Sequence, residues 1–176
     1  MTTLEILKNT KSAWRDLSTK TTDEKTKILL SMADFLQKNC EKVLKNNEKD
    51  MANSRGIISD VMLDRLYLDE SRIAAMADGI REIVKLPDSV GETISETIRP
   101  NGMKILKKRV PIGLVAIIYE SRPNVTSDAA ALAVKSGNVC VLRGGKEAFN
   151  TSNAMGRRCR PGSRRTPRRC SRTYRS

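Results

Sequence analysis

The sequence predicts an α/β protein in which a helical N-terminal layer and a β-hairpin precede the start of a doubly wound parallel sheet. Three observations predict this fold. Apolar residues recur at helical spacing over residues 3–86, and side-chain character alternates over residues 92–109. After residue 110, two continuously apolar segments flank an alanine-rich helical stretch. We expect four segments: a helical layer (1–90), a hairpin arm (91–110), a first βαβ unit (111–154) and an Arg-rich tail (155–176).

The helical layer is predicted from apolar spacing and capping signals. A first helix is expected over residues 3–17. Thr21 and Glu24 stand three residues apart and form a capping box for a second helix, which we expect to run to about Asn46. Two further helices are expected, over residues 60–66 and from Ser71 to the Leu86-Pro87-Asp88 stop.

Residues 92–109 are predicted to form a hairpin. Strand-like alternation runs on both sides of Pro100-Asn101-Gly102, which is a strong turn signal. Because the hairpin is polar on both faces, we expect it to lie outside the core. An arm that pairs with another subunit and a solvated hairpin both remain open.

The next segment has the pattern of a βαβ unit. Residues 112–119 are continuously apolar, which is typical of a strand buried on both faces of a parallel sheet. A helix capped by Thr126 or Ser127 is expected to run through Ser136, and residues 139–142 repeat the buried-strand pattern. A right-handed crossover would place these two strands side by side.

A glycine turn, Arg143-Gly144-Gly145, ends the second of these strands. In a doubly wound, Rossmann-like sheet, such a turn lies at the carboxyl edge, where a nucleotide binds. Glycine lets the backbone approach a ligand, although a tight turn alone would also favour it.

Composition excludes several classes of protein. No uncharged apolar run reaches the roughly 18 residues that a membrane helix needs, and the N-terminus lacks the apolar stretch of a signal peptide. We therefore expect a cytoplasmic protein. The chain has four cysteines and no histidine, which excludes Cys-His zinc sites and Ser-His or Cys-His catalytic pairs. No metal is expected.

Basic residues are concentrated in the tail. Residues 157–176 contain nine Arg and neither Lys nor acid, so subtracting them from the 33 basic side chains leaves 24 basic and 20 acidic residues. The change to Arg alone predicts translation in a shifted reading frame, and a segment of this composition is expected to be disordered when free. The alternative is a non-enzymatic protein whose Arg-rich tail binds nucleic acid through its phosphates.

The segment VPIGLVAIIYESRPNVTSDAAALAVKSGNVCVLRGGKEA, residues 110–148, closely resembles the gamma-glutamyl phosphate reductase family of the aldehyde dehydrogenase superfamily. YESRPN and LRGG are distinctive of this family, and DRL at 64–66, LPDSVG and RPNGMKI extend the resemblance over residues 5–154. The resemblance implies the start of an aldehyde dehydrogenase-type cofactor domain, truncated before its catalytic half. It implies an oxidoreductase of proline biosynthesis, in which NADPH reduces L-glutamyl 5-phosphate to L-glutamate 5-semialdehyde and phosphate.

The same resemblance implies that the nucleophile is missing. In this family a cysteine thiolate attacks the acyl phosphate, and hydride then reduces the thioester. That cysteine belongs to a second domain, beyond the region matched here. Cys140 lies in an apolar strand and Cys40 near a helix end, and neither has the surroundings of a nucleophile. The resemblance therefore predicts an inactive fragment.

Two residues of the YESRPN element are candidates for the reaction itself. Asn124 stands where the superfamily places an oxyanion-donating amide, although an Asn that shapes the turn after Pro123 is the alternative. Arg122 is a candidate for binding a substrate carboxylate or phosphate. Its alternative role is a structural ion pair with Glu120 or Asp128.

Arg143, Gly144, Gly145 and Lys146 are the candidate cofactor-binding residues. Superfamily members contact the adenosine ribose at this strand end, and two cations would suit the 2′-phosphate of NADPH. A solvated basic loop is the alternative. The resemblance also implies partners: L-glutamyl 5-phosphate as a small-molecule substrate, a second copy through the 91–110 hairpin, and glutamate 5-kinase of the same pathway. No membrane partner is expected.

Overall fold

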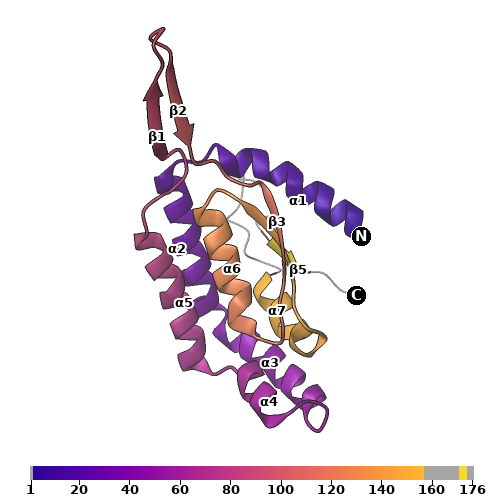
Figure 1. The fold of residues 1–176 in the computed structure, drawn as a ribbon. Helices are drawn as coiled ribbons and strands as arrows, with labels where there is room; N and C mark the ends of the chain where they lie inside the picture. Colours follow the sequence, from indigo (N-terminus) through magenta and orange to yellow (C-terminus); the bar gives the residue numbers. More distant parts are fainter. Residues whose placement is uncertain (1, 157–170, 174–176) are drawn as a thin grey trace.

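The computed structural model describes residues 2–156 and 171–173, with a hairpin that projects from one end of a helical body (Figure 1). The helices of the first half are α1 (Thr3–Ser18), α2 (Thr22–Lys38), α3 (Cys40–Ser54), α4 (Asp60–Leu66) and α5 (Glu70–Lys85). The hairpin strands are β1 (Thr93–Ile98) and β2 (Lys104–Lys108). The remaining elements are β3 (Leu114–Ile118), α6 (Pro123–Lys135), β4 (Val139–Arg143), the short 3-10 helix η1 (Lys146–Ala148), α7 (Phe149–Gly156) and β5 (Ser171–Thr173).

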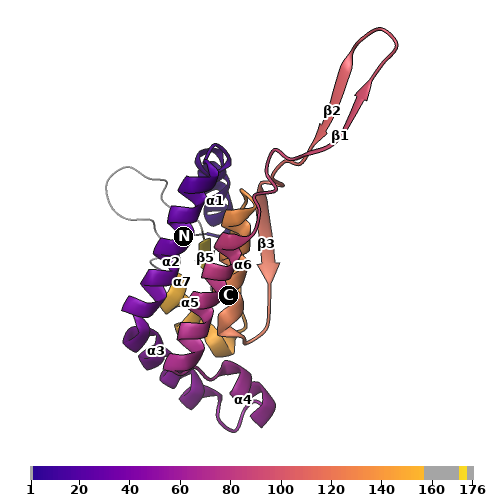
Figure 2. The same cartoon turned by 90° about the vertical axis from the view of Figure 1, so that its left-hand side faces the viewer.

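The core lies where α2, α5 and α6 pack together (Figure 2), and α6 in turn packs against β4. Leu29 of α2, Ile80 of α5 and Ala131 of α6 have no exposed surface at all. The buried face of α6 is rich in alanine, which lets this helix approach both the helical pair and the sheet closely. None of the described helices is long and apolar enough to cross a membrane.

The predicted second helix is divided at Asn39. It starts as expected, because Thr21 Oγ1 accepts the Glu24 N–H while the Glu24 carboxylate accepts the Thr21 N–H. At Asn39 the backbone leaves helical geometry (φ −112°, ψ 19°), and the side-chain amide donates to the Phe35 carbonyl at 2.9 Å. Asparagine competes in this way with helical hydrogen bonds. The chain therefore bends into α3, which continues past the predicted stop at Asn46.

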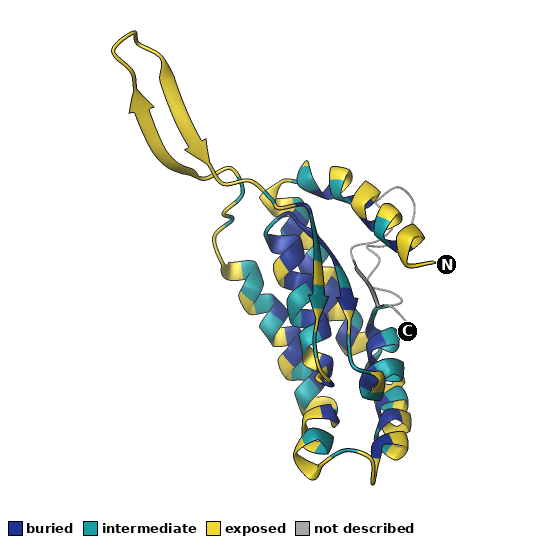
Figure 3. Ribbon diagram, turned by 45° about the vertical axis from the view of Figure 1, so that its right-hand side comes forward, coloured by how far each residue is buried: buried dark blue, intermediate teal, exposed yellow. Residues whose placement is uncertain are grey.

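The hairpin is present as predicted. β1 and β2 pair antiparallel, and every residue of both strands is exposed (Figure 3). Ion pairs of 2.7 Å between Lys104 and Glu96 and between Arg109 and Glu92 link the two strands and their ends. Exposed ion pairs contribute little to stability. The hairpin therefore depends on its backbone ladder and adds nothing to the core.

β3 and β4 are parallel, with α6 as the crossover between them, as predicted for a βαβ unit. β4 is mostly buried, but Ala116 and Ile118 of β3 are exposed, and Ile118 keeps 79% of its surface. The prediction that residues 112–119 form a strand buried on both faces is therefore wrong here. The reason is that β3 is the outer strand of the described sheet, and among the described elements only β4 and α1 pack against it to any extent.

β5 pairs in parallel with the other side of β4, which gives the strand order β3-β4-β5. The prediction of a disordered tail from residue 155 onward thus needs correction, since residues 155 and 156 end α7 and residues 171–173 form a strand. A ladder is built from backbone N–H and C=O groups, so an Arg-rich sequence can extend it. Residues 157–170 and 174–176 lie outside the described residues. The predictions of disorder and of nucleic-acid binding concern mainly these residues, and they stay predictions.

Gly137 ends α6, as predicted, in the left-handed conformation (φ +70°). A Cβ at this position would lie 2.9 Å from Cγ of Pro111, so a side chain would be both strained and crowded. The Gly137 carbonyl accepts the Trp14 indole N–H at 3.2 Å, and the Asn138 side chain accepts the Gly113 N–H at 2.8 Å. These bonds dock α1 and the start of β3 onto the end of α6.

Asp88 links the base of the hairpin to α2. Its carboxylate forms a 2.5 Å ion pair with the buried Lys25 and accepts hydrogen bonds from Thr22 Oγ1 (2.7 Å) and the Val90 N–H (3.0 Å). Burial acts to raise the pKa of Asp88, but the hydrogen bonds from Lys25 and Thr22 outweigh it and hold the pKa below its usual value.

We expect the stabilising contribution of Asp88 to disappear at low pH. A carboxyl whose pKa is lower in the folded state stabilises the fold above its unfolded pKa of about 3.9, and this contribution is lost as pH falls through the folded pKa. In urea unfolding, Asp88→Asn should lower the free energy of unfolding at neutral pH and change it little at the lowest pH at which the unaltered chain folds. Equal losses at both pH values would show that the ionised carboxylate is not responsible.

Candidate functional site

The predicted site residues gather at the carboxyl edge of the parallel strands. Arg122 and Asn124 follow β3, while Gly144, Gly145 and Lys146 follow β4. The two strand ends stay paired beyond β3, because the Tyr119 N–H donates to the Arg143 carbonyl at 3.0 Å. In open α/β sheets, ligands bind outside this edge.

Asn124 lies in the first turn of α6, which begins earlier than predicted. Pro123 is the first helical residue, where its missing N–H costs no hydrogen bond, and Arg122 is the N-cap. The predicted caps Thr126 and Ser127 are therefore inside the helix, and Ser127 Oγ instead donates to the Asn124 carbonyl at 2.7 Å. Because the helix starts at Pro123, Asn124 is held by a helical backbone and does not lie in a loop before the helix, as the prediction implied.

The Asn124 side chain is exposed and only weakly engaged. Its Nδ2 lies 3.5 Å from Oδ2 of Asp128, four residues along the same helix face. An amide has two N–H groups, and no other described residue accepts from this one. The side chain therefore keeps a donor for a ligand.

Asn124 and Asp128 line a cavity of about 430 Å³. The cavity lies between α5, α6 and the α4–α5 connection. In Figure 1 the start of α6 and the α4–α5 connection lie at the end of the body away from the hairpin. Its volume is within the range of about 300–1,000 Å³ typical of small-molecule sites. Its walls include Arg65, Tyr67, Arg72, Met76, Asn124 and Asp128.

The Asp128 carboxyl is half-buried in this cavity. Burial raises the pKa of Asp128, and the hydrogen bonds from Ser127 Oγ (3.2 Å) and the Asn124 amide only partly offset that effect. Sequence reasoning considered Asp128 only as a partner of Arg122. The i, i+4 spacing from Asn124 is the signal that could have placed both side chains on one face.

Arg122 is exposed, and it is not among the residues that line the cavity. In the part of the chain that the structure describes, it forms no ion pair with Glu120 or Asp128, so the structural alternative is not found there. Its backbone N–H donates to the Glu120 carbonyl at 2.8 Å. A role in binding substrate stays a prediction.

Arg143 and Lys146 are exposed, and neither has an ion pair with any described residue. The nearest acid in sequence, Glu147, instead accepts a hydrogen bond from Ser121 Oγ at 2.9 Å. Two unpaired cations at the carboxyl edge of a parallel sheet form a region that attracts anions.

The glycines of the turn are constrained by neighbouring side chains. A Cβ on Gly144 would lie 3.1 Å from Oη of Tyr119, and a Cβ on Gly145 would lie 2.5 Å from Oε2 of Glu147 and 2.9 Å from Oγ of Ser121. A side chain at either position would therefore have to displace neighbouring side chains, which is consistent with the tight-turn alternative. Close approach of a ligand to this backbone stays a prediction.

Two of the cysteines lie in the described residues. Cys140 is buried within β4. Burial raises the pKa of Cys40, and the nearby Glu70 and Glu41 raise it further. A nucleophilic cysteine needs the opposite shift, so neither thiol has the surroundings of a nucleophile.

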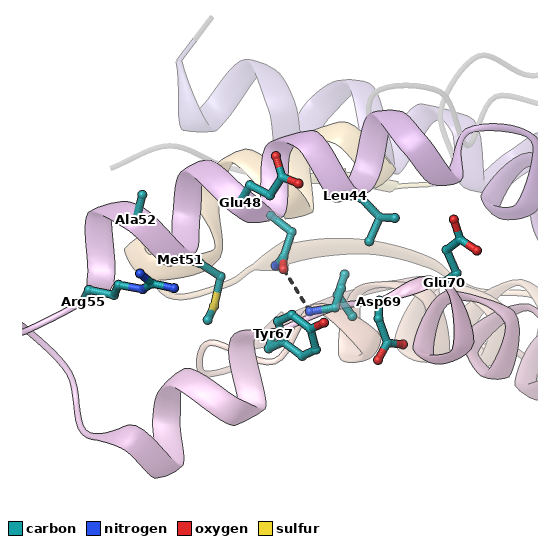
Figure 4. A pocket seen from close by; sticks show the side chains of 10 residues that line it. Leu44, Glu48, Met51, Ala52, Arg55, Tyr67, Asp69 and Glu70 are labelled. Carbon is teal, nitrogen blue, oxygen red and sulfur yellow. Dashed lines mark hydrogen bonds between the residues drawn. The ribbon is translucent and has the colours of Figure 1, made fainter.

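A second cavity, of about 450 Å³, lies between α3 and the α4–α5 connection (Figure 4). Asn47 contributes to its wall, and its Oδ1 accepts the Leu68 N–H at 2.9 Å, the bond drawn in Figure 4. No residue proposed from the sequence lines this cavity. The sequence analysis missed the polar residues on the buried face of α3, although Asn47, Asp50 and Ser54 continue the helical spacing of Val43.

The fold is that of the N-terminal part of aldehyde dehydrogenases. A probable aldehyde dehydrogenase from Listeria monocytogenes has a TM-score of 0.63 at 16% identity, over 89% of this chain and 32% of that chain. Likeness at this identity concerns the fold alone. No family model matches the chain.

Over most of its length, the chain is a homologue of gamma-glutamyl phosphate reductases, which confirms the resemblance. The reductase of Carboxydothermus hydrogenoformans is 50% identical over 86% of this chain, and that of Streptococcus pneumoniae is 55% identical over 80%. The structure of the Thermotoga maritima reductase has a TM-score of 0.86 at 39% identity, over 89% of this chain and 38% of that chain. The chain spans 37% and 34% of the length of the two curated relatives.

Proposed function

We propose that this chain forms the part of an NADPH-dependent reductase that holds the oxyanion donor and the first half of the cofactor site. The reaction is the reduction of L-glutamyl 5-phosphate to L-glutamate 5-semialdehyde and phosphate, in proline biosynthesis. The observation that carries the proposal is the Asn124 amide, held on the first turn of α6 beside the 430 Å³ cavity. Its support is the similarity of the chain to the reductases of Carboxydothermus hydrogenoformans (50% identical) and Streptococcus pneumoniae (55% identical).

The position of Asn124 suits acyl transfer. When a thiolate attacks an acyl phosphate, the carbonyl oxygen becomes an oxyanion, and donors fixed in advance stabilise that charge. Asn124 offers an N–H that no described residue accepts, and the positive end of the α6 dipole adds to its effect. The structure supports a donor role for Asn124 and offers no nucleophile among the described cysteines.

The carboxyl edge suits the phosphorylated ribose of NADPH. Arg143 and Lys146 are exposed there, and their charges are not neutralised by any acid in the described ranges. We assign the 2′-phosphate to these two side chains. When bound, the cofactor supplies the hydride that reduces the thioester.

A chimeric enzyme tests the proposed function. The matched part of the Streptococcus pneumoniae reductase is replaced by the corresponding residues of this chain, and NADP⁺ reduction is followed with glutamate 5-semialdehyde and phosphate, the reverse reaction. We expect the chimera to turn over, and the 176-residue chain alone to show no turnover because its described cysteines are not activated. A chimera that folds like the parent enzyme but has no activity would refute the proposal.

We expect the double change Arg143→Ser and Lys146→Ser to raise the KM of the chimera for NADP⁺ about tenfold or more. Loss of a charge-assisted contact to phosphate weakens binding by at least this factor. KM for NAD⁺ should change little, because NAD⁺ lacks the 2′-phosphate. Lys49→Ser, at an exposed position of α3, is the matched control. Similar increases for both cofactors would rule out recognition of the 2′-phosphate.

The hairpin is proposed to pair with a second copy of the chain. Its exposed apolar side chains support this role, among them Ile98, which keeps 68% of its surface exposed. Two copies would bury these side chains and satisfy the open strand edges. In the chimera, Ile98→Lys should shift sedimentation toward the monomer, and an unchanged profile would favour the solvated hairpin.

A further inference from the structure

The cavity beside Asn124 contains a carboxylate with no charged partner. Asp128 is half-buried, and its hydrogen-bond donors are the neutral groups of Ser127 (3.2 Å) and Asn124 (3.5 Å). Among the described residues, no Lys or Arg forms an ion pair with it. Burial raises the pKa of Asp128, so a cation arriving in the cavity would relieve a desolvation cost that its hydrogen bonds offset only in part.

A cation with no acidic partner lines the same cavity. Arg65, in the last turn of α4, is exposed and has no ion pair with any residue in the described ranges. The second arginine of the wall, Arg72, is already engaged: it pairs with Asp64 at 2.8 Å, donates to the Tyr67 carbonyl and stacks on the Tyr67 ring. Arg72 is therefore part of the wall, and Arg65 is the cation available to a ligand.

We propose that this cavity recognises an α-amino acid as its zwitterion, with Asp128 accepting from the ammonium group and Arg65 pairing with the α-carboxylate. The side-chain acyl group of the ligand then reaches the amide of Asn124, which lines the same cavity. This inference rests on the proposed function and adds to it the residues that select the substrate.

The proposal explains why a reductase would accept an amino acid derivative rather than any acyl compound. A ligand without an ammonium group would leave the Asp128 carboxylate desolvated and unpaired, and one without an α-carboxylate would leave Arg65 unpaired. Discrimination against a ligand that leaves a polar group of the site unmatched is stronger than discrimination by shape alone.

Binding to the full 176-residue chain tests the inference without requiring turnover. Three probes are titrated and followed by the NMR signals of the Asn124 side-chain amide: L-glutamate 5-methyl ester, monomethyl glutarate, which lacks the ammonium, and methyl 4-aminobutanoate, which lacks the carboxylate. We expect the ester to bind about tenfold or more tightly than either other probe. Equal binding of all three, or no shift from the ester up to its solubility limit, would overturn the inference.

Two variants test which residue contacts the ammonium group of the ligand and which contacts its α-carboxylate. Asp128→Asn should weaken binding of the ester about tenfold and should not weaken binding of monomethyl glutarate, because that probe has no ammonium to lose. Arg65→Gln should weaken the ester and leave methyl 4-aminobutanoate unchanged. Equal weakening of all probes would show that the two residues act only through the shape of the cavity, and the inference would fail. These binding results do not decide the proposed function, which would be refuted separately by a folded but inactive chimera.

Discussion

Replacing Asn124 by alanine in the chimeric reductase is expected to lower kcat about 100- to 1,000-fold, the usual cost of removing one oxyanion donor. The reason is that its exposed amide has an N–H without an acceptor in the described structure, at the positive end of α6. An oxyanion forms only as the reaction proceeds, so the loss should fall on kcat and leave KM nearly unchanged.

The control for this variant is Asn46→Ala. The Asn46 side chain donates only within its own helix, to the Lys42 carbonyl at 2.7 Å, and neither residue lines the cavity beside Asn124. Its removal should leave kcat unchanged. If Asn124→Ala altered kcat less than about tenfold, or raised KM alone, the amide would act in ground-state binding or in the turn, and its catalytic assignment would be wrong.

Asp50 carries the largest expected effect on stability. Its buried carboxylate joins α3 to the first turn of α7 through four hydrogen bonds. Two come from Asn150, through the backbone N–H at 3.1 Å and Nδ2 at 2.8 Å, and two from Thr151, through the backbone N–H at 2.7 Å and Oγ1 at 2.6 Å. The carboxylate thus caps a helix distant in sequence.

Asp50→Ala should lower the free energy of unfolding by about 3 kcal/mol or more, because it removes charge-assisted hydrogen bonds and leaves buried donors without acceptors. A domain of this size is stable by only about 5–15 kcal/mol, so urea unfolding will detect the loss easily. Asp50→Asn keeps part of the acceptor capacity, so its free energy of unfolding should lie between those of the unaltered chain and Asp50→Ala. Asp16→Ala, at an exposed position of α1, should cost little. Equal effects of Asp50→Ala and Asp16→Ala would contradict the capping role.

Local sequence signals predicted the elements well. The capping box at Thr21 starts α2, and Gly137 ends α6 in the left-handed conformation. The signals were weaker where two local preferences compete. Asn39 was assigned to the middle of a helix because its neighbours have helical spacing, yet its side chain ends that helix. The start of α6 was placed at Thr126 or Ser127 because both are good caps, whereas Pro123 had already started the helix.

The candidate site was predicted in part. Asn124 and the Arg143–Lys146 turn were expected at one sheet edge, and the parallel pairing of β3 and β4 brings them there. Arg65 was not foreseen, because it is far from Asn124 in sequence and only the packing of α4 and α5 beside α6 places both on one cavity. The roles of these residues stay proposals.

The sequence by itself determined the family resemblance, the helical layer, the hairpin and the βαβ order up to residue 143, and the position of Asn124 just after a parallel strand. These features depend on local periodicity, turn residues and motifs, which act over a few residues. Only the tertiary structure decided that Asp50 caps α7, that β3 lies at the open side of the described sheet, and that Asp128 and Arg65 share a cavity. The physical reason is that burial and hydrogen-bond pairing depend on which distant segments pack together, and a linear pattern does not specify those contacts.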